Sequence, residues 1–172
     1  IYSGANRKVQ DNVRASKNLV PIERSDRDRS RIAPHNVVVD LADLAKDNKV
    51  GAARDIGWSF AASDPRWSKA KGQDSWTDRI GGDSYSFTKS GGGYSIAVNS
   101  DGYDDAATKK KLNAANVVVL SVKNRKDRDT TSSLSIVSDT VGSGKVEIHR
   151  DGKVLTGTWK RSSKTAPMTF TD

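Results

Sequence analysis

One short segment gathers most of the side chains that could do chemistry. Arg31–Asn36 places a guanidinium, a proline turn, an imidazole and an amide directly before the β-branched run Val37–Val39, which is predicted to be a fully buried strand. Proline fixes its own φ angle and restricts the residue before it, so the turn is expected to be stiff. An imidazole titrates near neutral pH and can act as a general acid or base. The segment therefore predicts a site, with His35 as the candidate catalytic residue beside Arg31 and Asn36 as candidate ligand-binding residues.

The same residues also allow a purely structural interpretation. The imidazole and the amide would then hydrogen-bond the backbone at a strand entrance, while Arg31 pairs with an acid. On the functional interpretation, Arg29 joins the ligand-binding residues, and Tyr94 and Tyr103 are candidate stacking surfaces. Both interpretations stay open at this point.

Other catalytic or metal-binding chemistry has less support. Only His35 and His149 can serve as imidazole bases, and the Gly-x-Ser-x-Gly motif of an esterase-type nucleophile does not occur. His149 alternates with Val146 and Ile148 along a strand pattern, which predicts an exposed histidine on a hairpin. The chain has no cysteine. An EF-hand frame placed on the Asn99–Asp105 turn puts Ala97 and Thr108 at its first and twelfth positions, where a calcium loop needs carboxylates. We therefore expect no metal and no other cofactor.

The composition favours an anionic partner. The 172 residues carry a net charge of +8 and an isoelectric point near 9.7. This charge suits nucleic acid, anionic lipid headgroups or phosphate-bearing cell-wall polymers, although a merely soluble basic surface has the same composition. Specific binding of nucleic acid is disfavoured, because acidic residues interleave with basic ones at 24–31 and 123–129 and no known nucleic-acid module occurs. No apolar run approaches the ~20 residues of a membrane helix, so membrane attachment is expected only through an upstream anchor.

The hydrophobic pattern predicts an α+β protein, with an α/β segment followed by a mainly antiparallel β module. The expected domains are 1–55, the C-terminal part of an α/β domain, and 56–172, a β-rich domain. In the first, an amphipathic helix at 5–17 precedes the Val37–Val39 strand, and Asp40 is the expected N-cap of a short helix. Residues 61–83 are predicted to form a long irregular loop.

The β module is predicted from alternating apolar residues and glycine turns. Strands are expected at 85–89 and 94–99, joined by a glycine-rich turn, and at 116–122, which is the most apolar strand and is expected to be central. Asp151-Gly152 separates two further strand patterns. This dipeptide is typical of a type I′ hairpin turn, because both of its residues tolerate positive φ angles.

Several segments, taken in order, resemble the YerB-type family of bacterial envelope lipoproteins, whose activity is unassigned. They are Arg31–Asn36 with Arg29 ahead of it, Asn116–Val119 after a Gly-Tyr-Asp-Asp turn, Gly142–Lys145 continuing through His149–Lys153 to Gly157–Lys160, and an opening Tyr2-Ser3-Gly4 turn. The resemblance implies a secreted or lipid-anchored protein with a mixed N-terminal domain and a β-rich C-terminal one.

The chain also departs from that family. The N-terminal arginine motif of the family is absent, and residues 61–83 have no counterpart in it. Ile96, Ala97 and Tyr103 stand where relatives tend to have an arginine and a histidine. The chain starts at Ile1 and stops within a hairpin pattern, so we expect it to be a fragment of a longer precursor.

Together these features lead us to expect an extracellular protein of the envelope, of Gram-positive type. It is expected to bind an anionic cell-wall polymer or a glycan, or else a protein partner in the envelope. Two alternatives remain: an envelope hydrolase or transferase that uses His35 as acid and base, and a structural subunit of an extracellular complex. The expected ligand-binding residues are Arg29, Arg31, His35, Asn36, Tyr94 and Tyr103.

Overall fold

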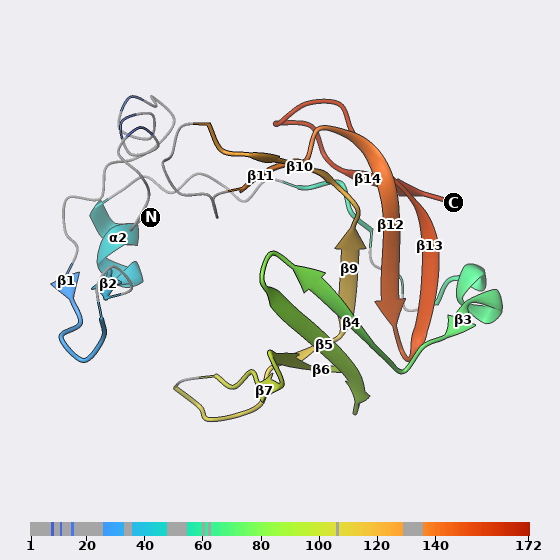
Figure 1. Cartoon of the computed structure of the whole chain (residues 1–172), viewed down its shortest axis with the longest axis horizontal. Coiled ribbons are helices and arrows are strands. Elements are labelled where there is room, and N and C mark those ends of the chain that lie inside the picture. The colour runs from blue at the N-terminus through green and yellow to red at the C-terminus, as the bar shows by residue number, and fades with distance from the viewer. Residues whose placement is uncertain are drawn as a thin grey trace. The chain divides into compact units, whose positions relative to one another are not determined.

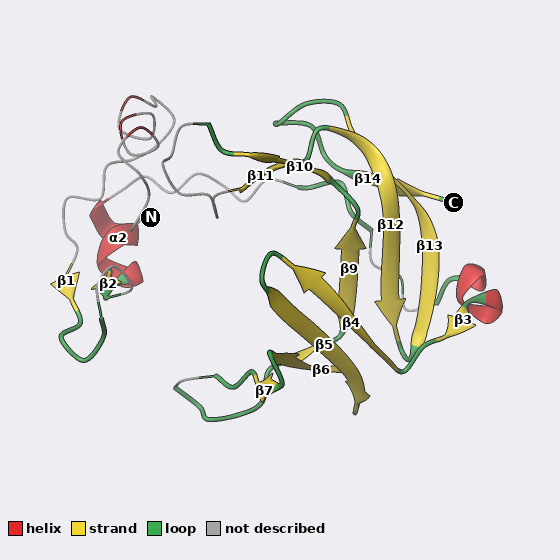
Figure 2. Ribbon diagram, in the orientation of Figure 1, coloured by secondary structure: helices red, strands yellow, loops and turns green. Residues whose placement is uncertain are grey.

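The computed structural model describes residues 8, 11, 15, 26–32, 36–47, 55–59, 61, 63–105, 107–128 and 136–172. The chain divides into two compact units: Ile1–Arg54 with Asp127–Ser135, and Asp55–Lys126 with Ile136–Asp172. In the described residues, strands predominate over helices (Figure 2) and every strand pair is antiparallel. No helix of this described part is long and apolar enough to cross a membrane.

The first unit contains a small strand pair and a short helix. Strand β1 (Asp26–Arg27) pairs with β2 (Val37–Val38), and helix α2 (Leu41–Asp47) follows. The carboxylate of Asp40 accepts hydrogen bonds from the backbone N–H groups two and three residues further on, at 2.7 and 3.2 Å. The expected N-cap at Asp40 is therefore confirmed.

The helix expected at 5–17 lies largely outside the described residues. Lys8, Asp11 and Ala15 are helical, whereas the apolar residues on which the expectation rested, Ala5, Val9 and Val13, are not described.

The predicted α+β class, with its α/β segment, is wrong: the chain is mostly antiparallel β. Strand β2 is only two residues long and its partner is antiparallel, so it is not a strand of a parallel α/β sheet. Val38 is 42% exposed, so β2 is not fully buried either. A short β-branched run indicates a strand but does not distinguish a buried strand from a surface hairpin.

The second unit is built around the long hairpin of β12 (Gly142–Arg150) and β13 (Lys153–Arg161), drawn in orange and red in Figure 1. Strand β9 (Asn116–Leu120) pairs with β12, while β14 (Thr169–Thr171) and β3 (Lys71–Gly72) pair with β13. The resulting order is β14-β13-β12-β9. The expectation that β9 is central is therefore wrong, because it lies at the end of this order.

A second sheet has the order β4-β5-β6-β7, and β8 also pairs with β6. Its strands are β4 (Ser75–Ile80), β5 (Asp83–Ser90), β6 (Gly93–Val98), β7 (Asp101–Gly102) and β8 (Asn113–Ala114). The expected β5–β6 hairpin is confirmed. The long loop expected at 61–83 is wrong, because this range holds the 3-10 helix η1 (Pro65–Lys69), β3 and most of β4. A separate exposed pair joins β10 (Lys123–Lys126) to β11 (Ile136–Asp139).

Aromatic side chains join the two sheets of the second unit. The indole of Trp76 in β4 stacks on Phe87 with ring centroids 4.8 Å apart, and on His149 of β12 with centroids 3.6 Å apart. Tyr94 meets the same indole edge-on at 5.1 Å. Tyr94 is fully buried, and its hydroxyl accepts a hydrogen bond of 2.8 Å from the N–H of Gly152. This cluster therefore forms the core between the sheets.

The turn between β12 and β13 has the expected conformation. Asp151 and Gly152 have φ angles of 52° and 76°, as a type I′ turn requires. A Cβ atom on Gly152 would collide with the Asp74 carboxylate and lie 2.8 Å from Lys89 Nζ. Gly152 is therefore needed for its backbone conformation, since the Asp74 and Lys89 side chains are exposed and can move away from an added Cβ atom.

We expect Gly152→Ala to lower the free energy of unfolding by about 1–2 kcal/mol, because alanine is disfavoured in the left-handed region. The urea midpoint of unfolding, followed by circular dichroism, measures this loss. Gly72→Ala is the matched control, because a Cβ atom there meets nothing within 4 Å and the φ angle is not positive. Equal midpoints for the two variants would contradict the prediction.

Candidate ligand-binding cleft

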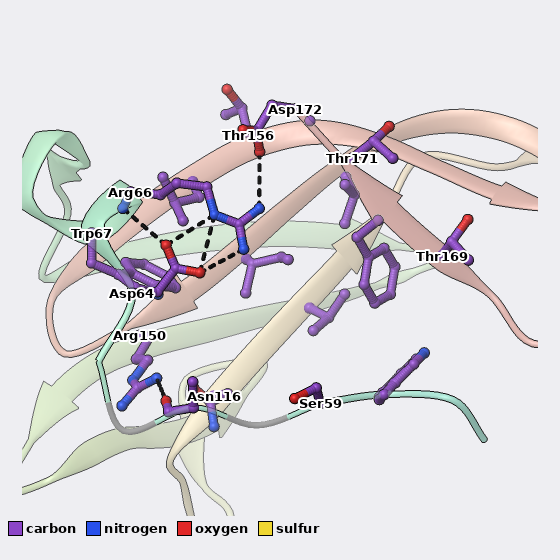
Figure 3. Close-up of a pocket in the computed structure, with 18 of the residues that line it drawn as sticks. Ser59, Asp64, Arg66, Trp67, Asn116, Arg150, Thr156, Thr169, Thr171 and Asp172 are labelled. Atoms are coloured by element: carbon purple, nitrogen blue, oxygen red, sulfur yellow. Dashed lines mark hydrogen bonds and ion pairs between the residues drawn. The ribbon is translucent and has the colours of Figure 1, made fainter. Parts of the chain in front are cut away.

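A cleft of about 390 Å³ opens on one face of the β14-β13-β12-β9 sheet of the second unit (Figure 3). This volume lies in the range of small-ligand sites. The register of β9, β12 and β13 places Val118, Ile148 and Leu155 in one row, and alternate residues of a strand share a face. With Val146 next along β12, these side chains line the cleft. The cleft therefore has an apolar floor.

An aromatic pair forms part of the cleft wall. Trp58 Nε1 donates a hydrogen bond of 2.8 Å to the carbonyl oxygen of Met168, and its ring lies 5.2 Å from that of Phe170, tilted by 52°. The positive φ angle of Gly57 turns the chain against Pro167. Trp58 nevertheless keeps 39% of its surface exposed. Its position thus combines fixed geometry with an accessible aromatic surface.

One end of the cleft carries a compact ion cluster, labelled in Figure 3. Asp64 caps helix η1 by accepting the N–H of Arg66, and the guanidinium Nη2 lies 2.6 Å from Asp64 Oδ2. Its Nη1 donates to Asp172 Oδ1 at 3.2 Å. Hydrogen bonds from Arg66 lower the pKa of Asp64 to about 2, and the two carboxylates raise the pKa of Arg66. The arginine is therefore paired with two acids.

Arg150 and Asn116, which are cross-strand partners, also line the cleft (Figure 3). Arg150 Nη1 donates to the carbonyl oxygen of Ala61 at 2.9 Å, and its Nε donates to Asp151 at 3.1 Å. This guanidinium thus connects strand β12 to the segment around Ala61, which forms part of the cleft wall. Among the described residues, the charged side chains that line the cleft are two arginines and two aspartates, so their formal charges cancel.

The described residues of the predicted site lie in two different places. Arg31 pairs with Asp28 at 3.2 Å, and Asn36 Oδ1 accepts a hydrogen bond of 2.8 Å from Arg27. Arg29 is exposed near the same β1–β2 turn. The Arg31–Asp28 pair fits the structural interpretation of the segment, whereas the Asn36 amide bonds an arginine side chain rather than the backbone. His35, with Ala33 and Pro34, lies outside the described residues, so its proposed role stays a prediction.

The two tyrosines behave differently from each other. Tyr94 is fully buried against Trp76 and therefore offers no ring face to a ligand. Tyr103 is exposed, and its backbone N–H and C=O bond to Ile96 and Leu112. Neither tyrosine lines the cleft.

Sequence reasoning missed the cleft residues Trp58, Arg66 and Phe170. One local signal was available, because Asp64-Pro65 is a helix start with an N-cap acid and proline at the first helical position. The partnership of Trp58 with Phe170 has no local signal. No group of three or more acidic or histidine side chains within the described residues is arranged to hold a metal ion.

Comparison with known protein families identifies a matching family. The family described as "Protein of unknown function (DUF3048) C-terminal domain" matches residues 74–172. No curated protein and no solved structure matches the chain. The matched range contains the cleft floor on β9, β12 and β13 but excludes the wall at 57–67.

Proposed function

The chain belongs to the DUF3048 C-terminal domain family, and we propose that it is a non-catalytic binding module of the bacterial envelope whose ligand occupies the cleft. The resemblance of its motifs to YerB-type lipoproteins supports a secreted or lipid-anchored location. The cleft supports binding rather than catalysis, because its ionisable groups are engaged in ion pairs and its floor is apolar.

The balance of charge in the cleft favours a glycan over an anionic polymer. A sugar ring has an apolar face, which suits an aromatic wall such as Trp58 and Phe170. Its hydroxyl groups suit the carboxylates, guanidinium groups and amide that line the cleft. Two arginines opposite two aspartates create little net attraction for a polyanion. The ligand class that fits best is therefore an uncharged glycan, and the apolar floor suits the methyl group of an N-acetylated sugar.

The overall basic charge supports a second, weaker mode of binding. Every residue of β10 (Lys123–Lys126) is exposed, and three of its four residues are basic. Anionic polymers would adhere to such a surface through charge, and salt would screen that adhesion. Salt dependence therefore separates adhesion from occupation of the cleft.

Retention on purified Gram-positive cell walls, measured at low and high salt, tests the proposal. We expect the wild-type protein to stay bound at high salt and Val118→Lys to be released, because the new side chain obstructs the cleft. Val118 is 37% exposed, so its replacement leaves the core intact. Val141→Lys is the matched control, because it adds the same charge at a residue that is 41% exposed and lies outside the cleft lining.

Three other outcomes would overturn the proposal. Equal loss of all three proteins at high salt would reduce binding to charge adhesion. Loss of retention only in an Arg31→Ala, His35→Ala double variant would place the site in the first unit. Release of soluble wall fragments, abolished by His35→Gln, would identify the protein as an envelope hydrolase.

A further inference from the structure

His149 is the polar residue that is fully buried among the described residues. Neither Nδ1 nor Nε2 of its ring has a hydrogen-bond partner there. Buried polar side chains are normally hydrogen-bonded, so this pair of atoms requires an explanation. The position also contradicts the sequence expectation of an exposed histidine on the hairpin.

The ring of His149 fills the space between the two sheets of the second unit. Trp76 of β4 covers one face of the ring, with centroids 3.6 Å apart and an interplanar angle of 8°. The cross-strand partners of His149 are both apolar: Val117 on β9 and Val154 on β13. Tyr94 of β6 touches the same indole, and its hydroxyl is occupied by Gly152 N–H. The histidine is therefore part of an aromatic and aliphatic core.

Two carboxylates lie near enough to act on a charge in this ring. Glu147 on the same strand has Oε2 3.5 Å from His149 Nε2, close enough for attraction but without hydrogen-bond geometry. Asp78 on β4 is bound to Trp76 Nε1 at 3.0 Å. Burial lowers the pKa of His149 below its ordinary value of 6.5, while Glu147 and Asp78 oppose this shift. The ring is thus neutral in the native state near neutral pH.

We propose that His149 is a proton-sensitive joint between the two sheets: a proton taken up by its ring puts a charge into the core and loosens the packing of β4 on β12. The stacked geometry and the missing hydrogen-bond partners carry this proposal. In the native state water does not reach the His149 ring, so a charge on the ring would be unsolvated. In the unfolded chain water solvates the charged ring fully.

The joint is expected to affect the cleft as well. Ile148 and Arg150, the neighbours of His149 in β12, line the cleft on the opposite face of the sheet. Loosening of β12 therefore weakens ligand binding at acidic pH. This second consequence rests on the proposed function, whereas the loss of stability does not.

The direction of the pH effect follows from proton linkage. On acidification, His149 takes up its proton at a higher pH in the unfolded chain than in the native protein. The free energy of unfolding therefore keeps its full value above pH 6.5, where the ring is neutral in both states. It decreases as the pH falls from 6.5 towards the native pKa. Over that interval the unfolding equilibrium constant rises by up to about tenfold per pH unit.

The experiment is a urea unfolding series between about pH 7.5 and about pH 5.5, a range in which histidine titrates. We expect the wild-type unfolding constant to rise on acidification, and the rise to be absent in His149→Phe, which keeps a stacking ring without a titrating group. An equal rise in both proteins would overturn the proposal.

Nuclear magnetic resonance titration gives a second test that needs no change at His149. The chain has two histidines, so a His35→Gln variant shows the His149 ring alone. A native pKa at or above 6.5 would overturn the proposal, because Glu147 and the indole face would then stabilise the charged ring. This titration decides the matter if His149→Phe fails to fold. Loss of stability without loss of wall retention would overturn only the coupling to the cleft.

Discussion

Trp159→Ala is expected to lower the free energy of unfolding of the second unit by about 3–5 kcal/mol, the usual cost of removing a buried tryptophan. Trp159 is 2% exposed, and its Nε1 donates a hydrogen bond of 2.9 Å to the carbonyl oxygen of Ser121. Small domains are stable by about 5–15 kcal/mol, so this loss is a large part of the total. Urea unfolding followed by circular dichroism measures it.

The position opposite Trp159 explains why the indole is so closely packed. Gly144 is its cross-strand partner, and a Cβ atom there would lie 2.7 Å from Trp159 Nε1 and collide with the Ser121 carbonyl. Trp159→Phe is the control: it keeps an aromatic ring over Gly144 but loses the hydrogen bond, so a smaller loss is expected. A loss below about 1 kcal/mol for Trp159→Ala would contradict this account of the core.

The features predicted correctly from the sequence depend on neighbouring residues alone. The type I′ turn at Asp151-Gly152 and the N-cap at Asp40 each depend on one or two side chains that act on the adjacent backbone. Such short-range effects are the same in many folds. The hairpin of β5 and β6 was predictable for the same reason, since Gly91 and Gly92 join two strand patterns.

The error at His149 has a different cause. Alternation along β12 correctly separates Val146 and Ile148 from Glu147 and His149. The alternation does not show which face of β12 is covered. In this structure both faces are covered: one by the second sheet, and the other in part by the cleft wall. His149 therefore lies in the core, while Ile148 lines a cleft.

The cleft itself could not be predicted, because its wall and floor come from distant parts of the chain. Trp58 bonds to Met168, 110 residues away, and packs on Phe170. The same limitation explains the position of β9: its apolar sequence predicts a strand, but only tertiary pairing decides whether that strand is central or at an edge. The class α+β failed likewise, because the valine run before Asp40 has no parallel partner in the described residues.

Trp58→Ala is expected to weaken glycan binding by up to about tenfold, because an aromatic contact contributes about 0.5–1.5 kcal/mol beyond the area that it buries. A tetramer of N-acetylglucosamine is the probe, and titration calorimetry gives the dissociation constant. Tyr103→Ala is the control, since Tyr103 is an exposed aromatic residue outside the cleft lining. Trp58→Phe should retain part of the affinity, because its ring still offers an apolar face beside Phe170.

Unchanged affinity in Trp58→Ala would show that the aromatic wall does not contact the glycan. If the wild-type protein does not bind the tetramer but is still retained on purified cell walls, the binding role stands and the ligand is a different cell-wall component.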